Sequence, residues 1–76
     1  MLKDQSTARS GSNQRAEIIE RDEMCCGICG GRVADPADIE IDHILPISRG
    51  GLTVASNLQV AHGSCNRAKG VQVVSK

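Results

Sequence analysis

Residues 40–51 read EIDHILPISRGG, and this stretch decides how the rest of the chain is interpreted. Apolar and polar residues alternate at first in residues 38–45, which predicts a β-strand, and Pro46 ends its regular pairing. Asp42 and His43 stand side by side near the end of that strand. A carboxylate suits Mg²⁺ or Mn²⁺, and a neutral imidazole is a good general base at about pH 7, so the pair could serve phosphodiester hydrolysis. Taken alone, the pair is weak evidence, because Asp-His dipeptides are common and are usually polar surface residues.

Two short Cys/His motifs flank this stretch. Cys26 and Cys29 form C-x-x-C, and His62 and Cys65 form H-x-x-C, with 32 residues between the two motifs. Four such ligands favour a tetrahedral zinc site, because a turn with two-residue spacing points both ligands at one ion. A redox pair or two buried thiols is the alternative for a single C-x-x-C motif. Cys25 is left out of the predicted ligand set because C-x-x-x-C is the poorer knuckle spacing.

The composition indicates why a metal would be needed. The chain has 76 residues and no Phe, Tyr or Trp, so we expect one small domain with a weak aliphatic core. Structural zinc contributes on the order of 10–16 kcal/mol of apparent binding energy in small domains. No stretch resembles a membrane span or a signal core, so we expect no membrane partner and a reducing cytoplasm, where cysteines bind metal more often than they form disulfides.

Charge is distributed unevenly along the chain. Residues 1–42 carry five basic and nine acidic residues, a net charge of −4, whereas residues 43–76 carry four basic residues and no acid. A polyanion could therefore meet the second half without an acidic competitor nearby. Chance clustering in a short chain is the alternative. Arg49, Arg67 and Lys69 are the predicted contacts to a nucleic-acid backbone, although solvated helix charges would look the same.

The remaining segments predict a simple order of elements. Residues 1–11 are polar and predict a disordered tail, and residues 12–76 a single domain. A helix capped by Ser12 or Asn13 should run to about Glu23. Residues 58–62 predict a second strand, residues 63–70 a short helix, and residues 71–76 a tail or a final strand. The first helix should bury residues from one side, namely Ala16, Ile19 and also Ile18.

Taken together, three motifs resemble one known family. The run D-H-I-x-P-x-x-x-G-G is followed by the segment 57–59, Asn-Leu-Gln, and then by C-N-x-x-K-G. In order and spacing, with the interleaved Cys/His pairs, they are similar to the HNH endonucleases, a family of ββα-metal (His-Me finger) nucleases. The resemblance covers Arg21 to Gly70. It implies a small α+β domain with the ββα-metal fold, an N-terminal helix and a structural zinc.

The resemblance also implies roles for single residues. His43 would be the general base, and Asn57 would hold the histidine and its loop through amide hydrogen bonds. The third position of the family signature is Asn66, as in the H-N-N variants, where it ligates the catalytic cation together with the acid at Asp42. These oxygen ligands favour Mg²⁺ or Mn²⁺. The family usually has four cysteines in its knuckles, and here His62 replaces one of them.

The predicted function is therefore metal-dependent cleavage of DNA in a bacterial or phage-infected cell, and a larger phage or bacterial protein could deliver the domain. The first alternative is a catalytically inactive, zinc-finger-like DNA-binding module. A protein-interaction zinc domain is the second alternative, although the chain lacks aromatic residues and a long apolar patch. Asn57 could merely cap a turn, and Asn66 could be an N-cap or first-turn residue of the last helix.

Overall fold

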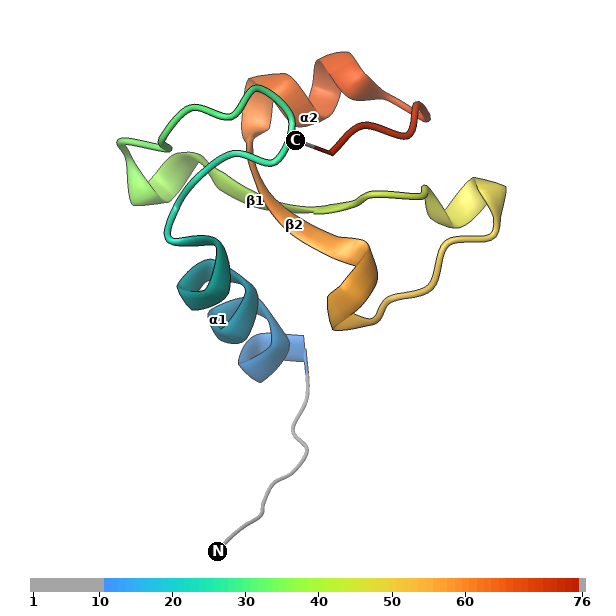
Figure 1. Ribbon diagram of the computed structural model, residues 1–76, viewed down its shortest axis with the longest axis horizontal. Helices are drawn as coiled ribbons and strands as arrows, with labels where there is room; N and C mark the ends of the chain where they lie inside the picture. Colours follow the sequence, from blue (N-terminus) through green and yellow to red (C-terminus); the bar gives the residue numbers. More distant parts are fainter. Residues whose placement is uncertain (1–10, 76) are drawn as a thin grey trace, which may run out of the picture.

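The domain is a β-hairpin with one helix before it and one helix after it. The computed structural model describes residues 11–75. Helix α1 (Gly11–Asp22) comes first, strands β1 (Ile39–His43) and β2 (Leu58–His62) form the hairpin, and helix α2 (Gly63–Lys69) follows β2 directly (Figure 1). Short 3-10 turns lie in the connections, at Pro36–Asp38, Ile47–Arg49 and Ala55–Asn57. The predicted small α+β fold is confirmed, with both strands and the last helix close to their expected positions.

The two strands pair antiparallel in a register that gives the hairpin two different ends. Ile39 lies opposite His62 at one end, and His43 lies opposite Leu58 at the other. Asp42 is opposite Gln59, and both side chains are buried. Successive residues of a strand point to opposite faces, so each strand has two sets of side chains. Helix α1 packs against β2, and α2 packs against both strands.

Helix α1 differs from its prediction at both ends. It begins at Gly11, so Ser12 and Asn13 lie inside the helix and not before it. It ends at Asp22, and the positive φ angles of Glu23 (54°) and Met24 (60°) prevent the helix from continuing. Except for Gly11, the predicted disordered tail lies outside the described residues.

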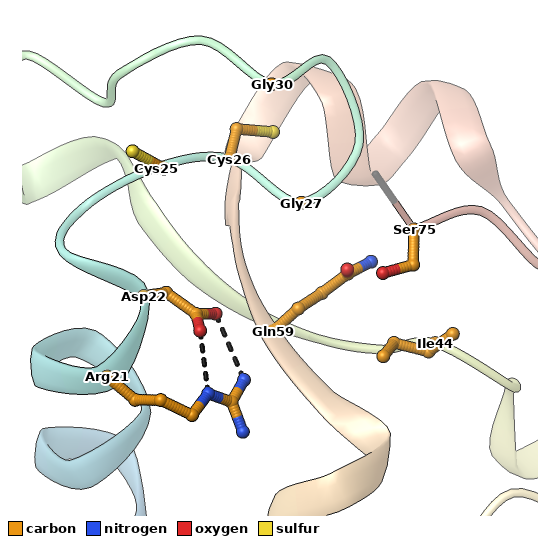
Figure 2. Close-up of a pocket in the computed structure, with 9 residues that line it drawn as sticks. All are labelled: Arg21, Asp22, Cys25, Cys26, Gly27, Gly30, Ile44, Gln59 and Ser75. Carbon is orange, nitrogen blue, oxygen red and sulfur yellow. Dashed lines mark hydrogen bonds and ion pairs between the residues drawn. The ribbon is translucent and has the colours of Figure 1, made fainter.

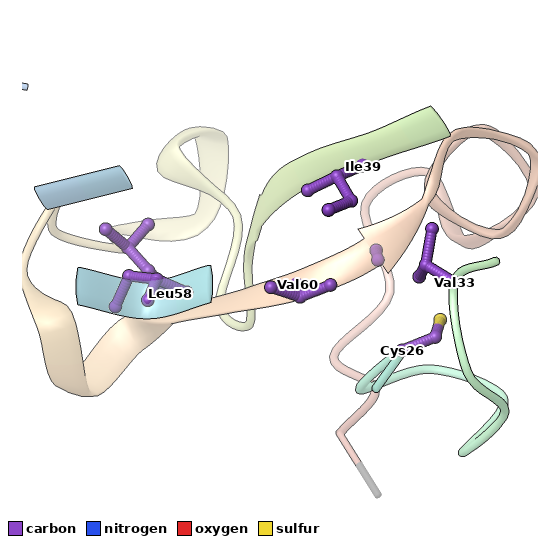
Figure 3. Close-up of a cluster of buried hydrophobic side chains, with 7 residues drawn as sticks. Cys26, Val33, Ile39, Leu58 and Val60 are labelled. Atoms are coloured by element: carbon purple, nitrogen blue, oxygen red, sulfur yellow. The ribbon is translucent and has the colours of Figure 1, made fainter. Parts of the chain in front are cut away.

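The core is small and entirely aliphatic apart from one cysteine. Ile18 is 1% exposed, whereas Ala16, which was expected on the apolar side of α1, is exposed and Ile19 is only partly buried. Figure 3 shows the cluster with Leu58 at one end and Cys26 at the other. The buried apolar residues are Ile18, Cys26, Val33, Ile39, Leu58, Val60 and Ala61. So few buried residues agree with the expectation that the fold needs a further source of stability.

The segment after α2 forms no strand within the described residues 71–75, so the alternative of a final strand is wrong for this part. It is held to the domain because Gln59 Nε2 donates to the Val74 carbonyl at 2.8 Å. Among residues 11–75, no helix is long and apolar enough to cross a membrane.

Candidate functional site

Four metal-binding side chains converge at the end of the hairpin where β2 meets α2. Cys26 and Cys29 come from the turn after α1, His62 ends β2, and Cys65 lies in the first turn of α2. Their ligand atoms all lie within 4.8 Å of one another. Gly30, with a φ of 82°, lets the chain turn back after Cys29. The predicted quartet therefore forms a single group that could hold one metal ion.

The distances in this group fit a tetrahedral zinc ion. His62 Nδ1 lies 3.5 Å from Cys29 Sγ and 3.7 Å from Cys65 Sγ. A zinc ion with bonds of about 2.3 Å to sulfur and about 2.0 Å to nitrogen would place these ligands about 3.5 Å apart. His62 Nε2 lies 3.1 Å from the Arg32 carbonyl, which can only accept a hydrogen bond. Nε2 therefore carries a proton, and in the neutral ring Nδ1 keeps the lone pair that a metal requires.

The backbone around Cys26 favours the thiolate, which is the form that binds metal. The N–H groups of Ile28 and His62 each donate to Cys26 Sγ at 3.4 Å. Burial of the thiol works against ionisation, but these donors and the backbone of Cys29 outweigh it and lower the pKa of Cys26 to about 6. A low thiol pKa at a C-x-x-C turn is therefore a further feature that suits metal binding.

Cys25 does not belong to the group. It is exposed, and its backbone pairs with Arg32 in an isolated bridge. The Cys25 and Cys26 sulfurs point away from each other (Figure 2). The exclusion of Cys25 from the predicted ligand set agrees with this arrangement.

A second set of polar side chains meets where β1 faces α2. Asp42 and His43 come from the end of β1, and Asn66 comes from α2. Together with Lys69 they line an open pocket of about 190 Å³, whose other lining residues are Ile41, Pro46, Ile47 and Gly70. The structure thus brings together three of the four predicted catalytic residues, and the fourth, Asn57, lies in the loop that precedes β2.

Asp42 is buried, and each of its two carboxylate oxygens has one partner. Its Oδ1 lies 3.3 Å from Lys69 Nζ, and its Oδ2 accepts from Gln59 Nε2 at 2.8 Å. Lys69 Nζ also donates to the His43 carbonyl at 2.9 Å. The Lys69 side chain is only 1% exposed, so the expectation that it contacts a nucleic-acid backbone is wrong. Lys69 instead ties the Asp42 carboxylate to the backbone of the neighbouring histidine.

The loop between the strands is held by Asn57. Its Oδ1 accepts from the Leu45 N–H at 2.9 Å, and its Nδ2 donates to the carbonyls of Leu45 (3.0 Å) and Leu52 (2.9 Å). His43 Nε2 lies 2.8 Å from Thr53 Oγ1 in the same loop. Thr53 was not predicted, since no pattern in the sequence relates it to His43.

Asn66 lies in α2, whose N-cap is His62, so Asn66 is not an N-cap residue. Its Nδ2 donates to Glu40 Oε1 at 2.8 Å. Within residues 11–75, its Oδ1 accepts no hydrogen bond, and Asn66 is one of the residues that line the pocket. An amide oxygen and the Asp42 carboxylate are the hard ligands that Mg²⁺ and Mn²⁺ prefer, so the residues present fit such a cation.

Comparison with known proteins agrees with this geometry. Residues 26–72 match the family model described as HNH endonuclease. The chain belongs to the HNH endonuclease family. The matched region contains the Cys/His quartet and the pocket residues, and HNH nuclease domains act on DNA. No curated protein and no solved structure gave a significant match to the chain.

Two of the three predicted contact residues, Arg49 and Arg67, are exposed and available to a polyanion. Arg49 donates to the Val71 carbonyl at 3.3 Å. The Arg67 side chain is 73% exposed and lies 3.8 Å from Glu40 Oε2. Both lie close to pocket residues in the sequence. Arg49 comes two residues after Ile47, and Arg67 comes directly after Asn66. They are the predicted contact residues that the structure leaves exposed.

Helix α1 is fastened to the hairpin of the HNH domain by a pair of residues that sequence reasoning missed. Arg21 Nε lies 2.7 Å from Asp22 Oδ1 (Figure 2). Arg21 also donates to the carbonyls of Ala55 (2.8 Å) and Leu58 (2.6 Å). Asp22 Oδ2 accepts from the Val60 N–H at 3.0 Å. Burial opposes ionisation of Asp22, but Arg21 and Val60 outweigh it and lower the pKa of this carboxyl below its usual value of 3.8.

The Arg21 and Asp22 side chains line a second pocket, of about 350 Å³, beside Cys25 and Gln59 (Figure 2). The polar groups of both residues are already used to anchor α1, and the Gln59 amide nitrogen is used by Asp42 and Val74. These hydrogen bonds make the pocket part of the structural frame of the HNH domain.

Proposed function

We propose that this HNH domain is a metal-dependent endonuclease that hydrolyses DNA phosphodiester bonds. The observation that carries the proposal is the convergence of Asp42, His43 and Asn66 on one open pocket. A carboxylate and an amide oxygen can hold a divalent cation there, and an imidazole lies beside them to act on a proton. This combination can supply the charge stabilisation and the proton transfer of phosphodiester hydrolysis.

In this mechanism His43 is the general base. His43 Nε2 lies 2.8 Å from Thr53 Oγ1, and in the tautomer in which Nε2 donates to this hydroxyl, Nδ1 keeps the lone pair that can take a proton from water. Lys69 holds the backbone carbonyl of His43, and Asn57 holds the loop that carries Thr53, so both the backbone of His43 and the ring's partner are fixed. A Mg²⁺ or Mn²⁺ ion held by Asp42 and Asn66 would stabilise negative charge on the phosphate and on the leaving oxygen.

The Cys/His quartet has a separate, structural role in this proposal. A zinc ion held by Cys26, Cys29, His62 and Cys65 would connect the turn after α1 to the junction of β2 and α2. Closed four-ligand sites of this kind leave no position for substrate and contribute directly to folding. The ion would therefore keep the hairpin and α2 together, while the chemistry takes place at the other pocket.

A catalytically inactive DNA-binding module is the second candidate, and one observation favours it. Asp42 already has an ammonium and an amide as partners, so a divalent cation must share the carboxylate with them. Each carboxylate oxygen has a second lone pair, which leaves room for such sharing. The two candidates differ in one outcome, since both bind DNA and only the endonuclease cuts it.

Plasmid cleavage by the zinc-loaded protein in Mg²⁺ or Mn²⁺ tests the proposal. We expect nicked or linear product from the wild-type chain and a loss of about 10²–10⁴-fold in rate for His43→Ala, the usual contribution of a general base. Circular dichroism and zinc content should remain those of the wild type. Equal cleavage by folded, zinc-loaded His43→Ala would refute the role of His43. A gel shift without any cleavage in either cation would favour the inactive module.

A further inference from the structure

Glu40 contacts Asn66, a residue of the proposed cation site, and has not been assigned a role. It precedes Asp42 by two residues on β1, so the two carboxylates belong to the same face of the strand. That face meets α2, where Asn66 lies. Glu40 Oε1 accepts from Asn66 Nδ2 at 2.8 Å, and this is the only hydrogen bond of the Asn66 side chain within residues 11–75.

The position of the Glu40 carboxylate is specified by more than this contact. Its Oε2 lies 3.8 Å from Arg67 on α2. It also packs against Gly63 at the start of that helix, where a Cβ atom would lie only 2.8 Å from Glu40 Oε2. A side chain at position 63 would therefore displace the carboxylate. The fold leaves space for Glu40 at the place where it meets the Asn66 amide.

The chemistry of this contact determines which end of the amide faces the pocket. An amide nitrogen can only donate hydrogen bonds, and a carboxylate can only accept them. The terminal torsion of asparagine is broad, so without a partner the amide has no strong preference between its two orientations. Glu40 binds the nitrogen, and this leaves the oxygen for a cation. The reverse orientation would present two N–H groups to a positive ion.

We propose that Glu40 is a positioning residue that orients Asn66 so that its amide oxygen, and not its nitrogen, is presented to the divalent cation. The inference rests on the proposed cation site at Asp42 and Asn66. Partners that orient a metal ligand typically account for about 10–100-fold in metal affinity. Because the Glu40 side chain is 43% exposed, we expect the lower end, about tenfold.

The test is Mn²⁺ binding to the zinc-loaded protein, followed through the electron paramagnetic resonance signal of free Mn²⁺. Glu40→Met removes the acceptor and should weaken Mn²⁺ binding about tenfold. Glu40→Gln removes the charge but keeps an acceptor oxygen, so its affinity should stay within about threefold of the wild type. Glu17→Met removes an exposed carboxylate on α1 and controls for net charge. Equal weakening by Glu40→Met and Glu40→Gln would show that charge and not orientation is responsible, and would overturn the proposal.

A second background sharpens the test. In Asn66→Asp both ends of the side chain are oxygens, so the orientation no longer matters. In this background Glu40→Met should leave the Mn²⁺ affinity unchanged. It could even raise the affinity, because the carboxylate at position 40 no longer lies beside the new carboxylate at position 66. An unchanged tenfold loss in the Asn66→Asp background would contradict the proposed mechanism of action. The shift of the Asn66 side-chain amide resonance in Glu40→Met gives a reading without any cation, and an unmoved resonance counts against the contact.

The proposed function and this inference fail in different ways. If the wild-type protein binds no Mn²⁺, both are wrong. If it binds Mn²⁺ with the predicted pattern among the Glu40 variants but cuts no plasmid, the positioning role stands and only the nuclease activity is refuted. If it cuts plasmid but Glu40→Met binds Mn²⁺ like the wild type, only the positioning role is refuted.

Discussion

Removing the ammonium of Lys69 should be among the most destabilising single changes in this domain. The Lys69 and Asp42 side chains are 1% and 6% exposed, and Lys69 Nζ also binds the His43 carbonyl at 2.9 Å. In Lys69→Met the aliphatic stem remains and the core packing changes little, but a buried carboxylate loses its counter-charge. Breaking a buried ion pair in this way typically costs about 3–5 kcal/mol. Because Gln59 still donates to Asp42 Oδ2, we expect the lower end, about 3 kcal/mol.

Urea unfolding of the zinc-loaded protein measures this effect. The chain has no Trp or Tyr, so far-ultraviolet circular dichroism is the appropriate signal. With a slope of about 1 kcal/mol per molar urea for a small domain, a loss of 3 kcal/mol would lower the midpoint by about 3 M. Arg67→Met is the matched control, because this cation lies on the same helix but is 73% exposed. We expect it to change the free energy of unfolding by less than about 1 kcal/mol.

The double variant Lys69→Met with Asp42→Asn identifies the source of the loss. If an unpaired buried charge is responsible, the neutral amide should restore at least half of the lost stability. The reasoning is refuted if Lys69→Met unfolds at the wild-type midpoint, or if the double variant is less stable than Lys69→Met alone.

Three further predictions concern the frame around the site. Zinc removal or Cys26→Ser should abolish the folded dichroism signal, because zinc binding and folding are coupled, whereas Cys25→Ser should keep it. Asn57→Ala should lower the free energy of unfolding by about 2 kcal/mol, since it removes three hydrogen bonds of roughly 1 kcal/mol each and leaves some of their partners to water. Asp22→Asn should lower the free energy of unfolding by the same amount at pH 7 and at pH 5. The pKa of Asp22 is lowered in the folded protein, so the stability that its carboxylate contributes is complete above the unfolded pKa of 3.8 and is lost only below it. A penalty for Asp22→Asn that already shrinks between pH 7 and pH 5 would contradict this assignment.

The parts of the fold that sequence reasoning predicted well depend on local signals. The alternation in residues 38–45 and the proline after it define β1, and the two-residue spacing of the Cys/His pairs defines the metal group. Each of these signals lies within a few consecutive residues, so it can be recognised without knowledge of the tertiary packing.

The parts that were missed depend on packing between distant segments. A count of basic residues cannot distinguish an exposed lysine from Lys69, whose role depends on Asp42, 27 residues earlier. With few apolar residues in α1, the helical period alone could not show that Ile18 is buried while Ala16 is exposed. The contact between Glu40 and Asn66 depends in the same way on how α2 lies across β1.

The two ends of the hairpin have a practical consequence for chelator experiments. The register places His62 opposite Ile39 at the end with the Cys/His quartet and His43 opposite Leu58 at the end with the proposed cleavage site. Four strand steps of about 3.4 Å separate these pairs, or about 14 Å. A general chelator such as EDTA would act on both sites, so loss of cleavage in EDTA reports unfolding as well as removal of the catalytic cation. Adding back Mg²⁺ alone should leave the protein inactive, and cleavage should return only when zinc is restored first and the Mg²⁺ second.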